Sequence, residues 1–116
     1  MIIGRFSAPL LLLAACANVT FVERVSIAND TKYPATVEVR GVNRGWLPIT
    51  TVSSGEKREV AEVIDQGQTW TFRFAYAGQE VEVEFRRGEL AAAQWLVEVP
   101  LELEERLHLQ GIPPPP

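Results

Sequence analysis

The sequence predicts an all-β fold, namely a seven-strand antiparallel β-sandwich followed by a short C-terminal helix. Along most of the chain, hydrophobic residues alternate with polar ones, as they do in strands that bury one face. Turn-forming residues interrupt this alternation about every eight to twelve residues, which is typical of sandwiches and barrels. The chain has 116 residues, enough for one domain with a hydrophobic core of ordinary size.

Four strands are expected in the first half of the domain, at residues 19–28, 35–40, 46–52 and 58–64. In each strand alternate hydrophobic residues share one face, as Val37 and Val39 do in the second strand. Polar turns separate these strands, and the first turn ends at Pro34. Because proline cannot donate a hydrogen bond to a ladder, Pro48 indicates that the third strand lies at a sheet edge or carries a bulge.

The fifth expected strand, 69–77, has the strongest pattern, because four aromatic residues share one face: Trp70, Phe72, Phe74 and Tyr76. The sixth, 80–86, places three glutamates on its outer face: Glu80, Glu82 and Glu84. A two-residue type II′ turn at Gly78-Gln79 is expected to join the two strands. This register would place Arg73 opposite Glu84 as a cross-strand ion pair rather than a substrate clamp.

The remaining elements are short. Residues 88–93 can form one helical turn, and 94–99 form the seventh expected strand. Leucines and early glutamates after Pro100 predict a helix over 100–111, because proline suits the first helical turn. Gly111 ends this helix, and a proline-rich tail with polyproline II character follows over 112–116.

The N-terminus begins with the positively charged segment Met1–Arg5, continues with apolar residues from Phe6 to Leu13, and then reads Leu13-Ala14-Ala15-Cys16. This order is that of a secretory signal peptide. Its last four residues resemble the lipobox of bacterial lipoproteins, in which the cysteine thiol receives a diacylglycerol and the leader is cleaved just before it. The alternative is a short buried element with Cys16 in the core, since the run is too short to span a bilayer, which needs about 20 residues.

The resemblance implies a mature chain that begins at Cys16. The expected organisation is a signal peptide (1–15), a lipidated tether (16–22), a β-sandwich domain (23–99), a short helix (100–111) and a Pro-rich tail (112–116). Cys16 is the only cysteine, so no disulfide can form within the chain. The expected location is the extracytoplasmic face of a bacterial membrane, and Ala17 after the cysteine favours the outer membrane where there is one.

Charge limits the partners of the domain. The whole chain has a formal net charge of −4 with 11 basic and 15 acidic residues, and loss of Arg5 with the leader leaves ten basic residues and −5. Nucleic acid is therefore not expected as a partner, because it requires a basic face. The membrane is expected as a partner through the lipid on Cys16, since each buried methylene contributes about 0.8 kcal/mol.

The sequence does not show a set of residues suited to catalysis. The single histidine, His108, lies in the expected C-terminal helix, so no nucleophile and base pair can be assembled. No metal or cofactor is expected, because histidine and cysteine do not cluster and no glycine-rich phosphate loop occurs. A carboxylate ladder on the sixth strand is more simply explained as a solvated face. An enzyme is the least expected class.

A binding surface is expected in the loop before the third strand. Trp46 follows the polar turn Asn43-Arg44-Gly45, and an exposed aromatic residue beside such a turn favours binding. Asn43, Arg44 and Trp46 are therefore the candidate binding residues. Trp70, in contrast, is expected in the core.

Two β-sandwich families are similar to the segment from Val25 to Val99, which resembles an immunoglobulin-like or transthyretin-like sandwich. Within it, Ser54-Gly55 and Gly67-Gln-Thr-Trp70-Thr-Phe72-Arg73 are similar to the β-domain of the von Hippel–Lindau tumour suppressor. That family binds a hydroxyproline peptide through a Tyr, a Ser and a His besides its Trp. Here Ile49, Ile64 and Gln68 stand at the polar positions, so the resemblance implies a shared topology without the same ligand pocket.

These observations leave three classes of function. The first is a non-catalytic binding module of the cell envelope with a protein or glycan partner, because an anchored sandwich presents loops and an edge strand. The second is a purely structural envelope domain without a specific ligand. Exposure of Trp46 and its loop distinguishes these two, and the third class, an enzyme, lacks the required residues.

Overall fold

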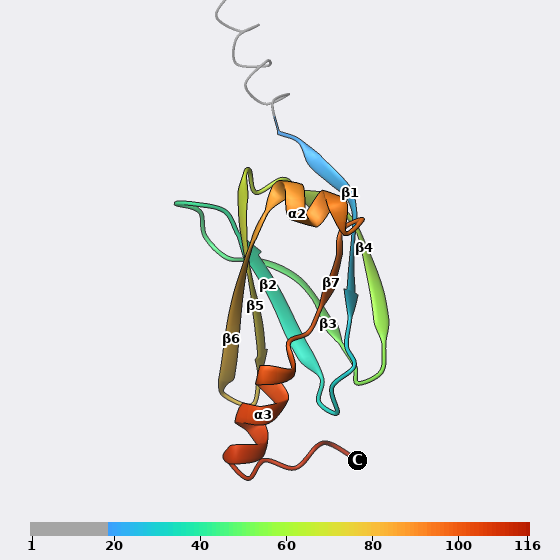
Figure 1. Ribbon diagram of the computed structural model, residues 1–116, viewed down its shortest axis with the longest axis vertical. Helices are drawn as coiled ribbons and strands as arrows, with labels where there is room; N and C mark the ends of the chain where they lie inside the picture. Colours follow the sequence, from blue (N-terminus) through green and yellow to red (C-terminus); the bar gives the residue numbers. More distant parts are fainter. Residues whose placement is uncertain (1–18) are drawn as a thin grey trace, which may run out of the picture.

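The computed structural model describes residues 19–116, and the expected leader and Cys16 lie outside the described residues. Seven strands form two sheets that enclose the core (Figure 1). The three-stranded sheet contains β1 (Phe21–Ala28), β4 (Lys57–Ile64) and β7 (Leu96–Glu98). The four-stranded sheet contains β2 (Ala35–Arg40), β3 (Leu47–Val52), β5 (Thr69–Tyr76) and β6 (Gln79–Arg86). The expected all-β sandwich is confirmed at this level.

Strand order places β1 in the middle of its sheet, as β4-β1-β7, while the other sheet has the order β3-β2-β5-β6. The expected edge position of the strand that contains Pro48 is confirmed, because among the described strands β3 pairs only with β2. A bulge accompanies it, since the register shifts between Val37, opposite Thr50, and Glu38, opposite Pro48. The chain thus accommodates a residue that cannot donate to a ladder.

The aromatic face of β5 forms the centre of the core. Trp70, Phe72 and Phe74 have no exposed surface, and their rings stack along the strand with centroids 6.1 and 6.2 Å apart. The rings of Trp95 and Trp70 pack edge to face, with their centroids 5.1 Å apart. The predicted core position of Trp70 is therefore confirmed. Its indole N–H donates a hydrogen bond to the Gly67 carbonyl oxygen at 2.9 Å.

The expectation that all strand pairs are antiparallel is wrong for β7, which runs parallel to β1. The short helix α2 (Arg87–Ala92) carries the chain from the end of β6 to the other sheet, so β7 starts from the same end as β1 (Figure 1). Strand β7 is also shorter than expected, because Gln94 and Trp95 have φ values of 55° and 59°, which do not fit an extended strand.

The predicted turn between β5 and β6 is also wrong. The two turn residues are Ala77 and Gly78, with φ values of 49° and 83°, as a type I′ turn requires. The register is displaced by two residues, so Arg73 lies opposite Glu82 and not Glu84. Because the side-chain period of a strand is two, this displacement leaves the aromatic face inside.

Two helices occupy opposite ends of the sandwich (Figure 1). The second, α3 (Leu101–Leu109), follows Pro100 and packs on β5 and β6 through the fully buried Leu103 and Leu107. Gly111 follows this helix with a φ of 69°. The next residue, Ile112, is held against the sandwich, because its carbonyl oxygen accepts a hydrogen bond from the Tyr33 hydroxyl at 2.5 Å. No helix in residues 19–116 is long and apolar enough to cross a membrane.

At the N-terminal side, β1 begins earlier than the expected sandwich boundary at residue 23. Phe21 pairs with Ile64 and Val22 with Val63. Val22 is 6% exposed, so it belongs to the core and not to a tether. The first described strand therefore starts five residues after Cys16.

Candidate functional site

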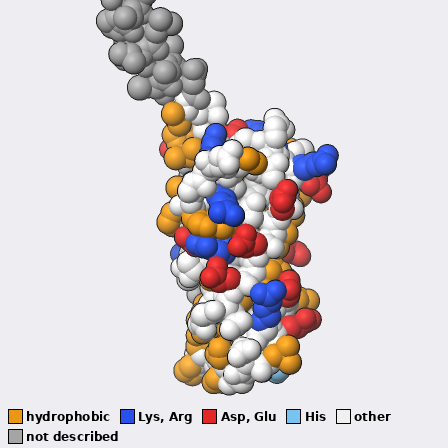
Figure 2. Space-filling model, turned by 90° about the vertical axis from the view of Figure 1, so that its left-hand side faces the viewer, with side chains coloured by type: hydrophobic (Ala, Val, Ile, Leu, Met, Phe, Trp, Pro, Cys, Tyr) orange, Lys and Arg blue, Asp and Glu red, His pale blue; other side chains and the backbone are white. Residues whose placement is uncertain are grey.

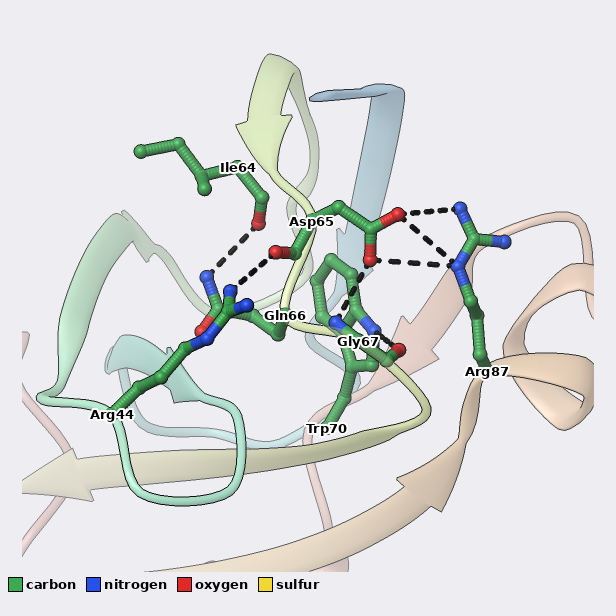
Figure 3. Close-up of polar contacts among 7 residues, drawn as sticks. All are labelled: Arg44, Ile64, Asp65, Gln66, Gly67, Trp70 and Arg87. Atoms are coloured by element: carbon green, nitrogen blue, oxygen red, sulfur yellow. Dashed lines mark hydrogen bonds and ion pairs between the residues drawn. The ribbon is translucent and has the colours of Figure 1, made fainter. Parts of the chain in front are cut away.

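The loop between β4 and β5 is the structural base of the candidate site (Figure 3). Asp65, the first residue of this loop, accepts hydrogen bonds from Arg87 Nη2 at 2.8 Å and Nε at 3.2 Å on its Oδ2 atom. Its Oδ1 atom accepts the Gly67 N–H at 2.9 Å. The carboxylate thus links the loop to the first residue of α2 and stabilises the positive-φ backbone at Gly67.

Both partners of this ion pair have altered acidity. The hydrogen bond from Arg87 is the main cause that lowers the pKa of Asp65 below its ordinary value, and burial opposes it. The Gly67 N–H and the charges of Arg87 and Arg44 lower that pKa further. The same hydrogen bond raises the pKa of Arg87. Both groups are therefore charged at neutral pH, and the pair holds the loop in one geometry.

The loop between β2 and β3, residues 41–46, is held against this base. The Gly41 N–H donates to Gln66 Oε1 at 2.8 Å, and Arg44 Nη1 donates to the Asp65 carbonyl oxygen at 2.6 Å. Approach is close at Gly41, where a Cβ atom would lie 2.2 Å from the Gln66 carbonyl oxygen. A side chain at this position would therefore push the two loops apart.

A polar hollow of about 330 Å³ lies beside this loop on the outer surface of the four-stranded sheet. Loop residues provide one wall, and side chains at the ends of β5 and β6 provide the other. Its lining residues are Arg40, Gly41, Val42, Asn43, Arg44, Thr69, Thr71 and Glu84. Guanidinium, amide, hydroxyl and carboxylate groups therefore converge on one space, which suits a ligand with many hydrogen-bonding groups.

Two of the three candidate residues, Asn43 and Arg44, line this hollow. Asn43 is exposed and has a φ of 58°, a conformation that asparagine adopts more readily than most residues. Arg44 is exposed as well, although one of its nitrogens is used to hold the loop. The local turn chemistry of Asn43-Arg44-Gly45 was thus sufficient to locate one wall of the hollow.

Trp46 has a different environment from the one expected, because it is only partly exposed. The guanidinium carbons of Arg40 and Arg73 lie over its ring, 4.4 and 4.0 Å from the centroid. Arg73 is itself held by Glu38, with Nη2 and Oε1 2.6 Å apart, and is 3.4 Å from a Glu80 oxygen. The indole therefore supports the Arg40 side of the hollow instead of projecting freely from the loop.

Arg73 forms an ion pair, as expected, but its partners are Glu38 and Glu80 and not Glu84. Its main partner is Glu38 on β2, which lies directly opposite it in the β2–β5 pairing. The hydrogen bond that Arg73 donates to Glu38 is the main cause that raises the pKa of Arg73. Glu80, Glu82 and Glu84 are exposed on the outer face of β6, as expected, and Glu84 contributes to the hollow.

An apolar groove between the two edge strands β3 and β4 is the feature that sequence reasoning missed. Its volume is about 230 Å³, and its apolar lining includes Phe21, Leu47, Ile49, Val60 and Ile64. The sequences of the individual strands do not predict this groove, because it forms only where β3 and β4 are the edge strands of the two sheets. Ile49 and Ile64 thus lie in this groove, while Gln68 is exposed in the β4–β5 loop.

Among residues 19–116, side chains suited to acid–base or metal chemistry do not gather near the hollow. His108 is exposed on α3, at the opposite end of the sandwich. Within the part of the chain that the structure describes, no group of three His, Cys, Asp or Glu residues is placed to hold a metal ion. The comparisons add no relative, since neither a protein-family model nor a curated protein nor a solved structure matches this chain.

Proposed function

We propose that this protein is an extracytoplasmic lipoprotein, anchored to a bacterial membrane through Cys16, and that it acts by binding and not by catalysis. The anchor is supported by the leader and by Leu13-Ala14-Ala15-Cys16. Binding is supported by the polar hollow at the β2–β3 loop, whose walls are held in place before any ligand arrives. Such preorganisation lowers the entropy cost of association.

The partner in this proposal is a polar component of the cell envelope, either a protein surface or a glycan. The observation that carries this choice is the hollow's lining, in which arginine, asparagine, threonine and glutamate side chains supply both donors and acceptors. No nucleic acid is proposed, because the chain is acidic. No cofactor is included.

The proposed fold relationship is an immunoglobulin-like or transthyretin-like sandwich, supported by one sheet of three strands and one of four. Similarity to the von Hippel–Lindau β-domain supports a related topology. The hydroxyproline peptide of that family is not proposed as a ligand. The reason is that Ile49 and Ile64, which stand at two of that family's polar ligand positions, make this surface apolar, and that the Trp70 indole is buried.

One observation favours a purely structural domain as the second candidate. Arg44 and Trp46 both make contacts within the chain that would stabilise the fold even if no ligand binds. A structural domain would keep these contacts for stability alone. The two candidates therefore differ in whether Asn43, which the structure leaves exposed at the tip of the loop, affects binding without affecting folding.

The anchor is tested by metabolic labelling of cells with an alkynyl fatty acid. Wild-type protein should be labelled and processed, whereas Cys16→Ser should be unlabelled and remain a precursor, because the thiol is the acylation point. Ala17→Ser is the control, since it leaves the thiol in place and should be labelled normally. Equal labelling of wild type and Cys16→Ser would contradict the anchor.

Binding is tested by NMR chemical shift perturbation with detergent-solubilised envelope fractions. We expect shifts for Asn43 and Arg44, and we expect Asn43→Gly, which removes the side-chain amide but tolerates the positive φ, to reduce the shift at Arg44 without lowering the melting temperature. The control is Asp30→Ala, an exposed substitution at the opposite end of the sandwich. If shifts gather at Glu80 and Glu82, or if no fraction produces shifts, the hollow is not the binding site.

A further inference from the structure

We propose that the end of the sandwich at which β1 begins rests on the lipid bilayer and inserts apolar side chains into its interface. This inference depends on the proposed anchor at Cys16. Seven large hydrophobic side chains are exposed in the described residues, and four of them lie at this end. They are Val19, Phe21, Val42 and Ile64, with exposed fractions of 53%, 55%, 67% and 39%.

The contacts of the chain place these residues at the same end of the sandwich. Phe21 pairs with Ile64, and the Asp65 N–H donates to the Thr20 carbonyl oxygen at 2.9 Å. The loop that carries Val42 is attached to the same place, through the hydrogen bond from Arg44 to the Asp65 carbonyl oxygen. Figure 2 shows hydrophobic side chains at the upper end of the described part, and others at its lower end.

The length of the tether determines which surface can cover these side chains. Five peptide units connect Cys16 to Phe21, and a chain of this length reaches at most about 18 Å when fully extended. The polar headgroup layer on one side of a bilayer is about 5–8 Å thick. An acylated Cys16 therefore keeps Phe21 close enough to the bilayer for this end of the sandwich to reach the interface.

Charge at this end favours apolar insertion over attraction to anionic lipid. The charged side chains near this end are four basic and four acidic ones, namely Arg40, Arg44, Arg86, Arg87, Glu62, Asp65, Glu84 and Glu89. With the charges balanced, contact must come from the apolar side chains, as in other interfacial proteins. The opposite end provides an internal comparison, because Leu101 and Leu109 on α3 are also exposed, at 58% and 85%, but lie far along the chain from the tether.

The test uses full-length protein expressed in a bacterial host, purified from its membrane and placed at one chain per disc in phosphatidylcholine nanodiscs. Methyl NMR signals are recorded with and without a gadolinium-labelled lipid headgroup. We expect the methyl signals of Val42 and Ile64 to lose at least fivefold more intensity than those of Leu101 and Leu109. Val42→Asp with Ile64→Asp should remove most of the broadening at Leu47, which lies beside Phe21 and Ile64, whereas Leu101→Asp with Leu109→Asp should leave it unchanged.

Intact mass separates the two proposals. If Cys16 carries acyl chains but both ends are broadened equally, or α3 more strongly, the anchor stands and membrane contact by this end is wrong. If Cys16 carries no lipid, the anchor is wrong and this inference falls with it. Broadening at Val42 that appears only when two chains share a disc would assign the patch to self-association and overturn the inference.

Discussion

Gly41 and Gly45 lie in the same loop, but their surroundings differ. A Cβ atom on Gly41 would meet the backbone of Gln66 at 2.2 Å, whereas a Cβ atom on Gly45 would meet nothing within 4 Å. Neither glycine has a positive φ, so the requirement at Gly41 is close approach and not backbone conformation. This close approach, together with the hydrogen bonds from Gly41 and Arg44, sets the distance between the two loops that shape the hollow.

We therefore expect Gly41→Ala to destabilise the protein by about 1–3 kcal/mol, the usual cost of an inserted methyl group in a packed position. Gly45→Ala is the matched control and should change stability little or increase it slightly, because alanine restricts the unfolded chain. Urea denaturation followed by tryptophan fluorescence measures both. Equal effects of the two substitutions would show that the loops are not in close contact.

Asp65 provides a second prediction, which concerns pH. Its pKa is lowered mainly by Arg87, so the folded protein releases the Asp65 proton more readily than the unfolded chain does. The stabilisation is therefore fully present above the unfolded pKa of about 4 and is lost as pH falls through the lowered folded pKa. Asp65→Asn, which keeps one oxygen for the Gly67 N–H, should cost of the order of 1–2 kcal/mol at pH 7, because Arg87 is partly exposed.

Denaturation of the wild type and Asp65→Asn from pH 7 down to pH 2 measures this difference, which should shrink toward zero in acid. In an Arg87→Gln background the effect of Asp65→Asn at pH 7 should be smaller, since the pair has already been broken. A difference that stays constant across this pH range would mean that the ion pair does not contribute to folding.

At the scale of elements, local patterns predicted the strands well and their long-range relations poorly. The bounds of β2 and the edge position of β3 follow from residues within each segment, such as Val37, Val39 and Pro48. The direction of β7 does not, because it depends on how α2 crosses to the other sheet. In the β5–β6 hairpin the position of Gly78 allowed two turn types, and Ala77 at positive φ carries no sequence signal.

The candidate site shows the same division between local and long-range information. The polar turn at Asn43 and Arg44 could be located from sequence because turn chemistry is local. The opposite wall could not, since Thr69, Thr71 and Glu84 come from two other strands. The partial burial of Trp46 has the same origin, because one of its two arginine partners, Arg73, lies on β5.

The turn after β1 shows how one residue can join two elements. Asn29 is 1% exposed, and its Nδ2 atom donates to the carbonyl oxygens of Tyr33 and Val52 at 2.7 and 3.1 Å. Its Oδ1 atom accepts the N–H and the hydroxyl of Thr31. The side chain thus connects the β1–β2 turn to the end of β3, a role beyond the surface turn that its sequence context indicated.

Asn29→Asp should therefore destabilise the protein by about 3 kcal/mol or more, because a buried carboxylate oxygen would face two carbonyl oxygens without a proton between them. The neighbouring exposed substitution Asp30→Asn should stay within about 0.5 kcal/mol of the wild type. Thermal melting by circular dichroism measures both variants. A small effect of Asn29→Asp would mean that this turn opens to water.

At the scale of the whole molecule, the two ends of the sandwich have different coverings. The end at which β1 begins presents α2, the two loops of the candidate site and the apolar residues near the tether. The other end is closed by α3 and by the attachment of Ile112 to Tyr33. If the anchor is at Cys16, the C-terminal end points away from the membrane, and α3 serves to cover the core.

This role of α3 leads to a prediction about truncation. A chain that stops after Val99 loses Leu103 and Leu107, both fully buried, and the hydrogen bond from Tyr33 to Ile112. Burial of one such leucine contributes about 1.5–3 kcal/mol, so the loss is about 3–6 kcal/mol, a large part of the stability of a small domain. A chain that stops after Ile112 loses only the four terminal prolines, which are exposed, and should melt at the wild-type temperature. Equal melting of all three chains would show that the helix is an appendage and that the two sheets alone make the folded domain.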